Sequence, residues 1–168
     1  IYLNEGMVSL AARTYQRALD TGEAGPDRLL RAAESLLARG AEAEASGFLV
    51  ALREASGEQL DSEESLKVLS LEARLALRRG DLETARERLE TVVARDPLNG
   101  SALMALGDTL RQLDQPEAAA LQYERALEDP DARVQALLAL GRLLVAQRRY
   151  QPALDYLARA QELEPRPY

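Results

Sequence analysis

The chain offers few side chains that could carry catalytic chemistry. It contains no histidine and no cysteine, so the commonest general base and the thiolate nucleophile are both absent. A Ser or Thr hydroxyl would need a lysine or a carboxylate to activate it, and Lys67 is the only lysine. Because Lys67 falls on an expected water-exposed helix, a solvated surface charge is the better interpretation. We expect this chain not to be an enzyme, unless an active site lies elsewhere in a longer protein.

Neighbouring carboxylates are the remaining candidates for acid–base or metal chemistry. Examples are Glu42 and Glu44, Glu63 and Glu64, and Glu162 and Glu164. None belongs to an oxygen-ligand loop of the Asp-x-Asp-x-Asn type, and adjacent carboxylates on a helix diverge by about 100°. No glycine-rich phosphate loop is present either. The sequence therefore predicts no catalytic residue, no metal site and no cofactor.

A repeat in the sequence predicts the helices on which the surface residues lie. Five alanines recur at a nearly constant spacing, with one longer step between the second and the third: Ala11, Ala45, Ala85, Ala119 and Ala153. A large apolar residue follows each alanine four positions later: Tyr15, Leu49, Leu89, Tyr123 and Leu157. Fixed self-similarity at a period of roughly 34 residues is typical of stacked helix hairpins.

A second set of small residues keeps the same register. Each of the last four alanines is preceded, at a constant separation, by a small residue: Ala33, Ala73, Gly107 and Gly141. Two antiparallel helices cross closely only where side chains are small, so we expect the two sets to mark the helix crossing in each hairpin.

The repeat resembles the tetratricopeptide repeat (TPR). The resemblance is carried by Leu106-Gly107, Ala119, Tyr123 and Ala126, and by Leu140-Gly141, Tyr150, Ala153, Ala160 and Pro165. Ala85 and Pro97 carry it in the third unit, whereas the second unit departs most, with Leu52 where the family usually has Ala. The resemblance implies an all-α, right-handed superhelical α-solenoid of stacked antiparallel hairpins with about 4.5 repeats. It says little about the ligand.

The prolines, glycines and repeat register predict the helices and repeat units. Helices are expected at 7–21, 27–39, 41–56, 62–79, 81–95, 100–113, 116–128, 131–147 and 150–164. We expect residues 1–168 to form a single solenoid with units at 1–25 (partial), 26–62, 63–98, 99–132 and 133–168. The chain opens and closes inside the repeat pattern, so we also expect it to be a piece of a longer protein.

Composition narrows the class of partner. The formal net charge is -7, and phosphate neutralisation needs clustered excess Lys and Arg, so a nucleic-acid partner is disfavoured. No apolar run approaches the roughly 20 residues of a membrane span. The composition, rich in Ala, Leu and Arg and poor in Lys, suggests a bacterial protein; cytoplasm and periplasm both remain possible.

The first helix of each hairpin is expected to line a concave groove, so the candidate binding residues come from those helices. They are Leu30, Glu34, Leu37, Ser70, Arg74, Leu77, Arg78, Met104, Asp108, Arg111, Leu138, Arg142 and Val145. Four arginines in this set form a ladder that could hold partner carboxylates, because guanidinium binds carboxylate through two hydrogen bonds. Ordinary pairing within the chain, for example of Arg74 or Arg111 with Asp108, is the alternative. Packing between first helices is likewise the alternative role for the apolar members.

The expected function is a protein-protein interaction scaffold or adaptor that binds a peptide or protein segment, acidic or amphipathic, in the groove. The alternative is a regulatory or substrate-recruiting TPR module of a larger enzyme or of an export or assembly machine. Some TPR proteins hold a C-terminal carboxylate with a Lys and Asn clamp, but the corresponding positions fall near Leu30 and Glu34, or Ser70 and Arg74, and do not match. A receptor for chaperone tails is therefore disfavoured.

Overall fold

All regular structure in the described part of the chain is α-helical. The computed structural model describes residue 17 and residues 26–56 and 62–164. Its helices are α2 (Pro26–Ala38), α3 (Glu42–Ser56), α4 (Ser62–Arg79), α5 (Leu82–Arg95), α6 (Gly100–Gln112), α7 (Pro116–Ala126), α8 (Arg133–Ala146) and α9 (Tyr150–Leu163). Each expected range from residue 27 onward agrees with the observed bounds to within two residues. The helix expected at 7–21 lies outside the described residues.

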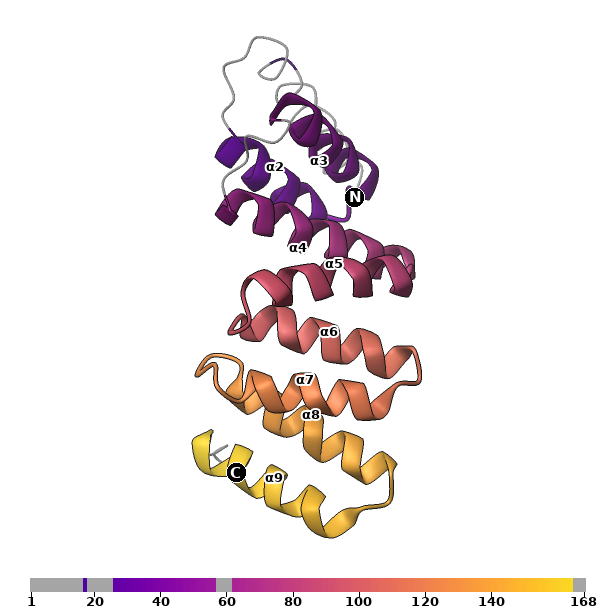
Figure 1. The fold of residues 1–168 in the computed structure, drawn as a ribbon, viewed down its shortest axis with the longest axis vertical. Coiled ribbons are helices and arrows are strands. Elements are labelled where there is room, and N and C mark those ends of the chain that lie inside the picture. The colour runs from indigo at the N-terminus through magenta and orange to yellow at the C-terminus, as the bar shows by residue number, and fades with distance from the viewer. Residues whose placement is uncertain (1–16, 18–25, 57–61, 165–168) are drawn as a thin grey trace. The chain divides into compact units, whose positions relative to one another are not determined.

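The chain divides into two compact units, residues 1–79 and 80–168. In unit 1, α2 packs against α3 and α4, as Figure 1 shows. Apolar side chains of all three helices form one core, which includes Leu29, Leu36, Phe48, Leu52 and Leu71. The third expected repeat, 63–98, has its first helix in unit 1 and its second in unit 2. The pairing of Ala73 with Ala85 would join residues of different units and stays a prediction.

Unit 2 is a run of antiparallel helices in which each packs against the next, from α5 to α9 (Figure 1). The first helices of its hairpins, α6 and α8, also contact each other. The largest side chains that are fully buried here include Leu103, Tyr123 and Leu137, one from each of α6, α7 and α8. This core positions the exposed side chains of α6 and α8 that were expected to bind a partner.

Close helix approach in unit 2 depends on the two first-helix glycines. A Cβ atom added to Gly107 would overlap the Tyr123 ring, only 2.7 Å from its Cδ1 atom. A Cβ atom at Gly141 would lie 2.7 Å from Leu157 Cγ and 3.5 Å from the backbone oxygen of Ala153. The expected small-residue register therefore coincides with close approach, and the nearest group is the large residue four positions after the alanine.

One turn position recurs with positive φ angles between helices. Gly40 and Gly80 have φ angles of 80° and 74°, and the equivalent Asp114 and Arg148 have φ angles of 58° and 60°. The left-handed conformation is favoured for Gly just past a helix C-terminus, because Gly lacks a Cβ atom. At Asp114 and Arg148 the same turn is thus made by residues for which this backbone conformation costs more free energy.

Polar side chains fix two helix starts in unit 2. The backbone N–H of Thr84 donates to Asp81 Oδ1 (3.1 Å), which caps α5, and the backbone N–H of Ala102 donates to Asn99 Oδ1 (2.9 Å), which caps α6. The Gly100 N–H donates to Asp129 Oδ2 (3.0 Å), in the connection between α7 and α8. The start of α6 is therefore tied to the connection at the end of the same expected repeat unit, 99–132.

Candidate functional site

Two apolar members of the predicted groove belong to the core of unit 1. Leu30 and Leu37 are 4% and 1% exposed, which corrects their assignment as groove contacts. The reason is geometric: α2 packs against α4 as well as α3, so residues that point away from α3 are covered by α4. The described surface of unit 1 cannot offer these two side chains to a partner.

The charged members in unit 1 are exposed but have partners within the chain. Arg74 pairs with Glu34 at 3.7 Å, and Arg78 pairs with Glu42 at 3.9 Å. The Ser70 hydroxyl donates to the backbone oxygen of Leu66 at 2.9 Å. For Arg74 and Arg78, the pairing within the chain foreseen as the alternative is thus present, with Glu34 rather than Asp108 as the partner of Arg74. Leu77 is half-buried.

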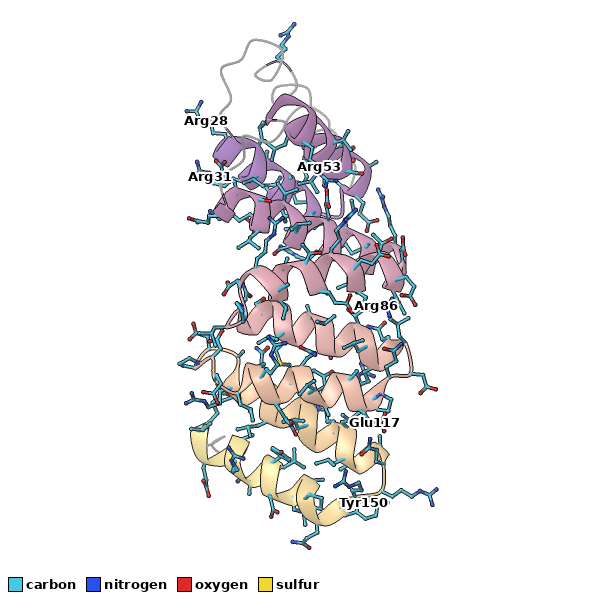
Figure 2. The ribbon with its side chains drawn as sticks, viewed as in Figure 1. Arg28, Arg31, Arg53, Arg86, Glu117 and Tyr150 are labelled. Carbon is cyan, nitrogen blue, oxygen red and sulfur yellow. The ribbon has the colours of Figure 1, made fainter. Side chains whose placement is uncertain are left out.

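The charged members of the predicted set in unit 2 line one hollow. Asp108, Arg111 and Arg142 line a cavity of about 500 Å³ between α6 and α8, together with Tyr123 of α7 and the turn residue Asp114. We call this surface the α6–α8 face. Met104 and Leu138 are half-buried and Val145 is 45% exposed, and none of the three lines the cavity. Figure 2 shows the side chains along these helices.

Tyr123 anchors the polar side of the cavity. The ring is fully buried, and the hydroxyl donates to Asp108 Oδ1 at 2.8 Å. Burial raises the pKa of Tyr123 well above its usual value, the Asp108 carboxylate raises it further, and Arg111 opposes the shift. The hydroxyl therefore stays protonated and keeps Asp108 as its acceptor. Sequence reasoning placed Tyr123 in the packing register alone and missed this hydrogen bond.

Arg142 offers an exposed cation at this cavity. Its side chain is exposed, and it makes no ion pair with any residue in the described ranges 26–56 and 62–164. Ala139, Leu143 and Ala146 give the α8 side of the cavity an apolar lining. A guanidinium next to apolar side chains can bind a carboxylate that is carried by an amphipathic segment.

The described residues contain neither a cluster suited to a metal ion nor a helix suited to span a membrane. Among residues 26–56 and 62–164, no group of three or more acidic, His or Cys side chains is placed to hold a metal ion. None of the helices α2–α9 is both long and apolar enough to cross a membrane.

Comparison with protein families identifies the repeat. The family model described as tetratricopeptide repeat matches residues 70–133 and 104–167, which together cover more than half of the chain. The chain belongs to the tetratricopeptide repeat family. The two matches begin 34 residues apart, and the predicted family is confirmed. A comparison with curated protein sequences finds no match.

Solved TPR structures share the fold across nearly the whole chain. MamA aligns with a TM-score of 0.80 at 17% sequence identity, over 95% of this chain and 90% of that chain. PilF of Pseudomonas aeruginosa aligns with a TM-score of 0.71 at 19% identity, over 83% of this chain and 61% of that chain. YrrB, described as a TPR protein with an unusual peptide-binding site, aligns with a TM-score of 0.71 at 15% identity, over 95% and 79% of the two chains. At these identities the likeness establishes the all-α TPR solenoid fold alone.

Proposed function

We propose that this TPR chain is a protein-binding scaffold that takes an acidic, amphipathic segment of a partner on the α6–α8 face. The observation that carries the proposal is the cavity of about 500 Å³ in which Arg111 and Arg142 meet apolar side chains of α8. Arg142 is the primary contact, because its charge has no partner among the described residues, and a partner carboxylate would supply one. Arg111, which interacts with the Tyr123 hydroxyl, would be a secondary contact.

Both the fold and the types of side chain in the chain support a role in protein binding. Helical repeats of this kind present extended surfaces to other proteins, and the TPR protein YrrB carries a peptide-binding site, as its description states. The absence of His and Cys from the chain removes the usual catalytic groups, which favours binding over catalysis. Arg74 and Arg78 of unit 1 already face Glu34 and Glu42, so we assign them a lesser part.

The test uses a designed peptide of known charge. A fluorescent 14-residue amphipathic Leu/Glu peptide is titrated with the full chain, and fluorescence anisotropy reports binding. Arg142→Glu replaces an attraction with a repulsion, so we expect the Kd to rise about tenfold, which corresponds to about 1.4 kcal/mol. The difference should shrink at 0.5 M salt, because exposed charges are screened.

Arg31→Glu is the matched control, since it makes the same charge change on the exposed surface of α2, outside the predicted binding set (Figure 2). A Kd change below twofold is expected for this variant. If the two reversals weaken binding equally, the peptide responds to net charge and the α6–α8 face is not its site. If the Leu/Glu peptide does not bind at all, the proposal is wrong.

A further inference from the structure

A second hollow in unit 2 lies between the second helices of its last two hairpins. Two cavities, of about 920 and 440 Å³, share Glu124 as a lining residue and form what we call the α7–α9 furrow. Side chains of α7 form one wall, side chains of α9 the other, and side chains of α8 the floor. Figure 2 labels Glu117 at the start of α7 and Tyr150 at the start of α9, at the same end of the unit.

The furrow is apolar at its base. Leu140, Leu143 and Leu144 of α8 form the floor of the larger cavity. Leu121 of α7 lines the same cavity and is 54% exposed, and Tyr156 of α9 is half-buried opposite. A large aliphatic side chain that is half in water beside an open apolar hollow gains burial when a partner covers it.

The charges on the α7 wall have one sign. Glu117 and Glu124 line the larger cavity, and Glu124 and Glu128 line the smaller one. None of the three carboxylates forms an ion pair with any residue in the described part of the chain. Glu117 and Glu124 are seven residues apart, which places them on one side of α7, about 10 Å apart at 1.5 Å per residue. Glu128 lies in the turn that follows α7.

The α9 wall is partly occupied by contacts of its own. The Arg159 guanidinium lies over the Tyr156 ring, 5.8 Å from its centroid, where the ring face attracts it. Arg133, at the end of the smaller cavity, donates from Nε to the backbone oxygen of Leu127 at 2.8 Å. Arg133 and Arg159 therefore make contacts within the chain, and a third cation, Arg149 at the start of α9, lines the larger cavity. The three carboxylates line the open furrow without an ion-pair partner among the described residues.

We infer that the α7–α9 furrow is a second docking site, for a basic amphipathic helix of a partner protein. The apolar ridge of that helix packs on Leu121, Leu144 and Tyr156, and its Lys or Arg side chains pair with Glu117, Glu124 and Glu128. Carboxylates along one wall beside an apolar floor are complementary to a helix of about 11–14 residues, read at the i, i+3, i+4 and i+7 positions. The two hollows share Leu143 as a lining residue. The inference is nevertheless separate from the proposed function, because it involves α7 and α9 in place of α6 and a partner of opposite charge.

The probe is a fluorescent 14-residue amphipathic Leu/Lys peptide, with a photo-crosslinking residue on its apolar face. Titrated against the full chain, it should bind one to one. Glu124→Lys and Leu121→Asp should each raise the Kd about tenfold. The matched controls are Glu87→Lys on α5, which makes the same charge change, and Leu98→Asp, which makes the same apolar-to-acid change at a residue 71% exposed. Both controls should change the Kd less than twofold.

The crosslinks and the variants distinguish this inference from the proposed function. We expect crosslinks to α7 and α9, and Arg142→Glu should not weaken Leu/Lys binding. Equal effects of Glu87→Lys and Glu124→Lys would overturn the inference, because the peptide would then respond to net charge alone. Crosslinks to α6, or no saturable binding, would also overturn it. If sedimentation shows a dimer that Leu121→Asp dissociates, a second copy covers the furrow, and the basic-helix assignment is wrong.

Discussion

Replacement of Gly107 by Ala tests the helix crossing on which the fold of unit 2 depends. In an open helix interior, Gly to Ala stabilises by about 1 kcal/mol through helix propensity. At Gly107 the new Cβ would lie 2.7 Å from Tyr123 Cδ1 and 3.0 Å from Cζ, so the rigid, fully buried ring must move. Overpacking of this kind costs about 1–3 kcal/mol. Loss of the hydrogen bond from Tyr123 to Asp108 adds about 1 kcal/mol. We expect a net destabilisation of about 1–3 kcal/mol.

Gly47→Ala is the matched control. Gly47 is exposed within α3, and a Cβ atom added there would meet no atom within 4 Å, so this substitution should stabilise by about 1 kcal/mol. The two variants should therefore differ by about 2–4 kcal/mol in urea unfolding followed by circular dichroism. Gly107→Leu and Ala119→Leu should cost about 2–4 kcal/mol each. If Gly107→Ala stabilises the chain as Gly47→Ala does, the close approach to Tyr123 is wrong.

Three further predictions concern turns and titrating groups. Asp114→Gly and Arg148→Gly should each stabilise by about 0.5–1 kcal/mol in thermal melts, because Gly relieves the cost of a positive φ angle; lower melting temperatures would contradict this. The hydrogen bonds from Thr84 hold the pKa of Asp81 below its usual 3.8, so its stabilising effect should be complete above pH 4 and lost as the pH falls through the lowered value. Asp81→Asn should lack this pH dependence. Tyr123→Phe should destabilise by about 1 kcal/mol, and in wild type the ultraviolet titration should show Tyr123 ionising above its usual pKa of 10.0. Since its pKa is raised in the folded state, stability should fall above pH 10, where the unfolded chain releases that proton.

The sequence predicts the helices and their hairpin register because both depend on local rules. Pro116 begins a helix where its missing N–H costs nothing, and Gly40 ends one in the left-handed conformation. The recurrence of alanine at a nearly constant spacing then predicts how the helices pair, and the family comparison confirms the repeat family over residues 70–167. Asp114 and Arg148 show that the turn is set by the repeat geometry even where the turn residue is unfavourable.

The binding surface is harder to predict because each first helix packs on two sides. Helical periodicity shows which residues of α2 point away from α3, but not that α4 covers Leu30 and Leu37. Ion pairs are difficult to predict for the same reason. Arg74 pairs with Glu34, which lies a full repeat earlier in the sequence, and only the packing of α2 on α4 determines the distance between the two side chains. For the same reason the sequence suggested an even ladder of arginines, whereas the structure distinguishes paired Arg74 and Arg78 from open Arg142.

The bond between Gly100 and Asp129 has a consequence for how unit 2 folds. It joins residues only 29 apart, and the hydrogen bond between Tyr123 and Asp108 joins residues 15 apart. Loop closure over such separations has a small entropic cost, and chains dominated by local contacts fold quickly. Nucleation can therefore begin at one hairpin and spread to its neighbour, with Asp129 completing the start of α6 once the next connection has formed. In this way the Asp129 carboxylate couples the start of α6 to the connection between α7 and α8 during folding.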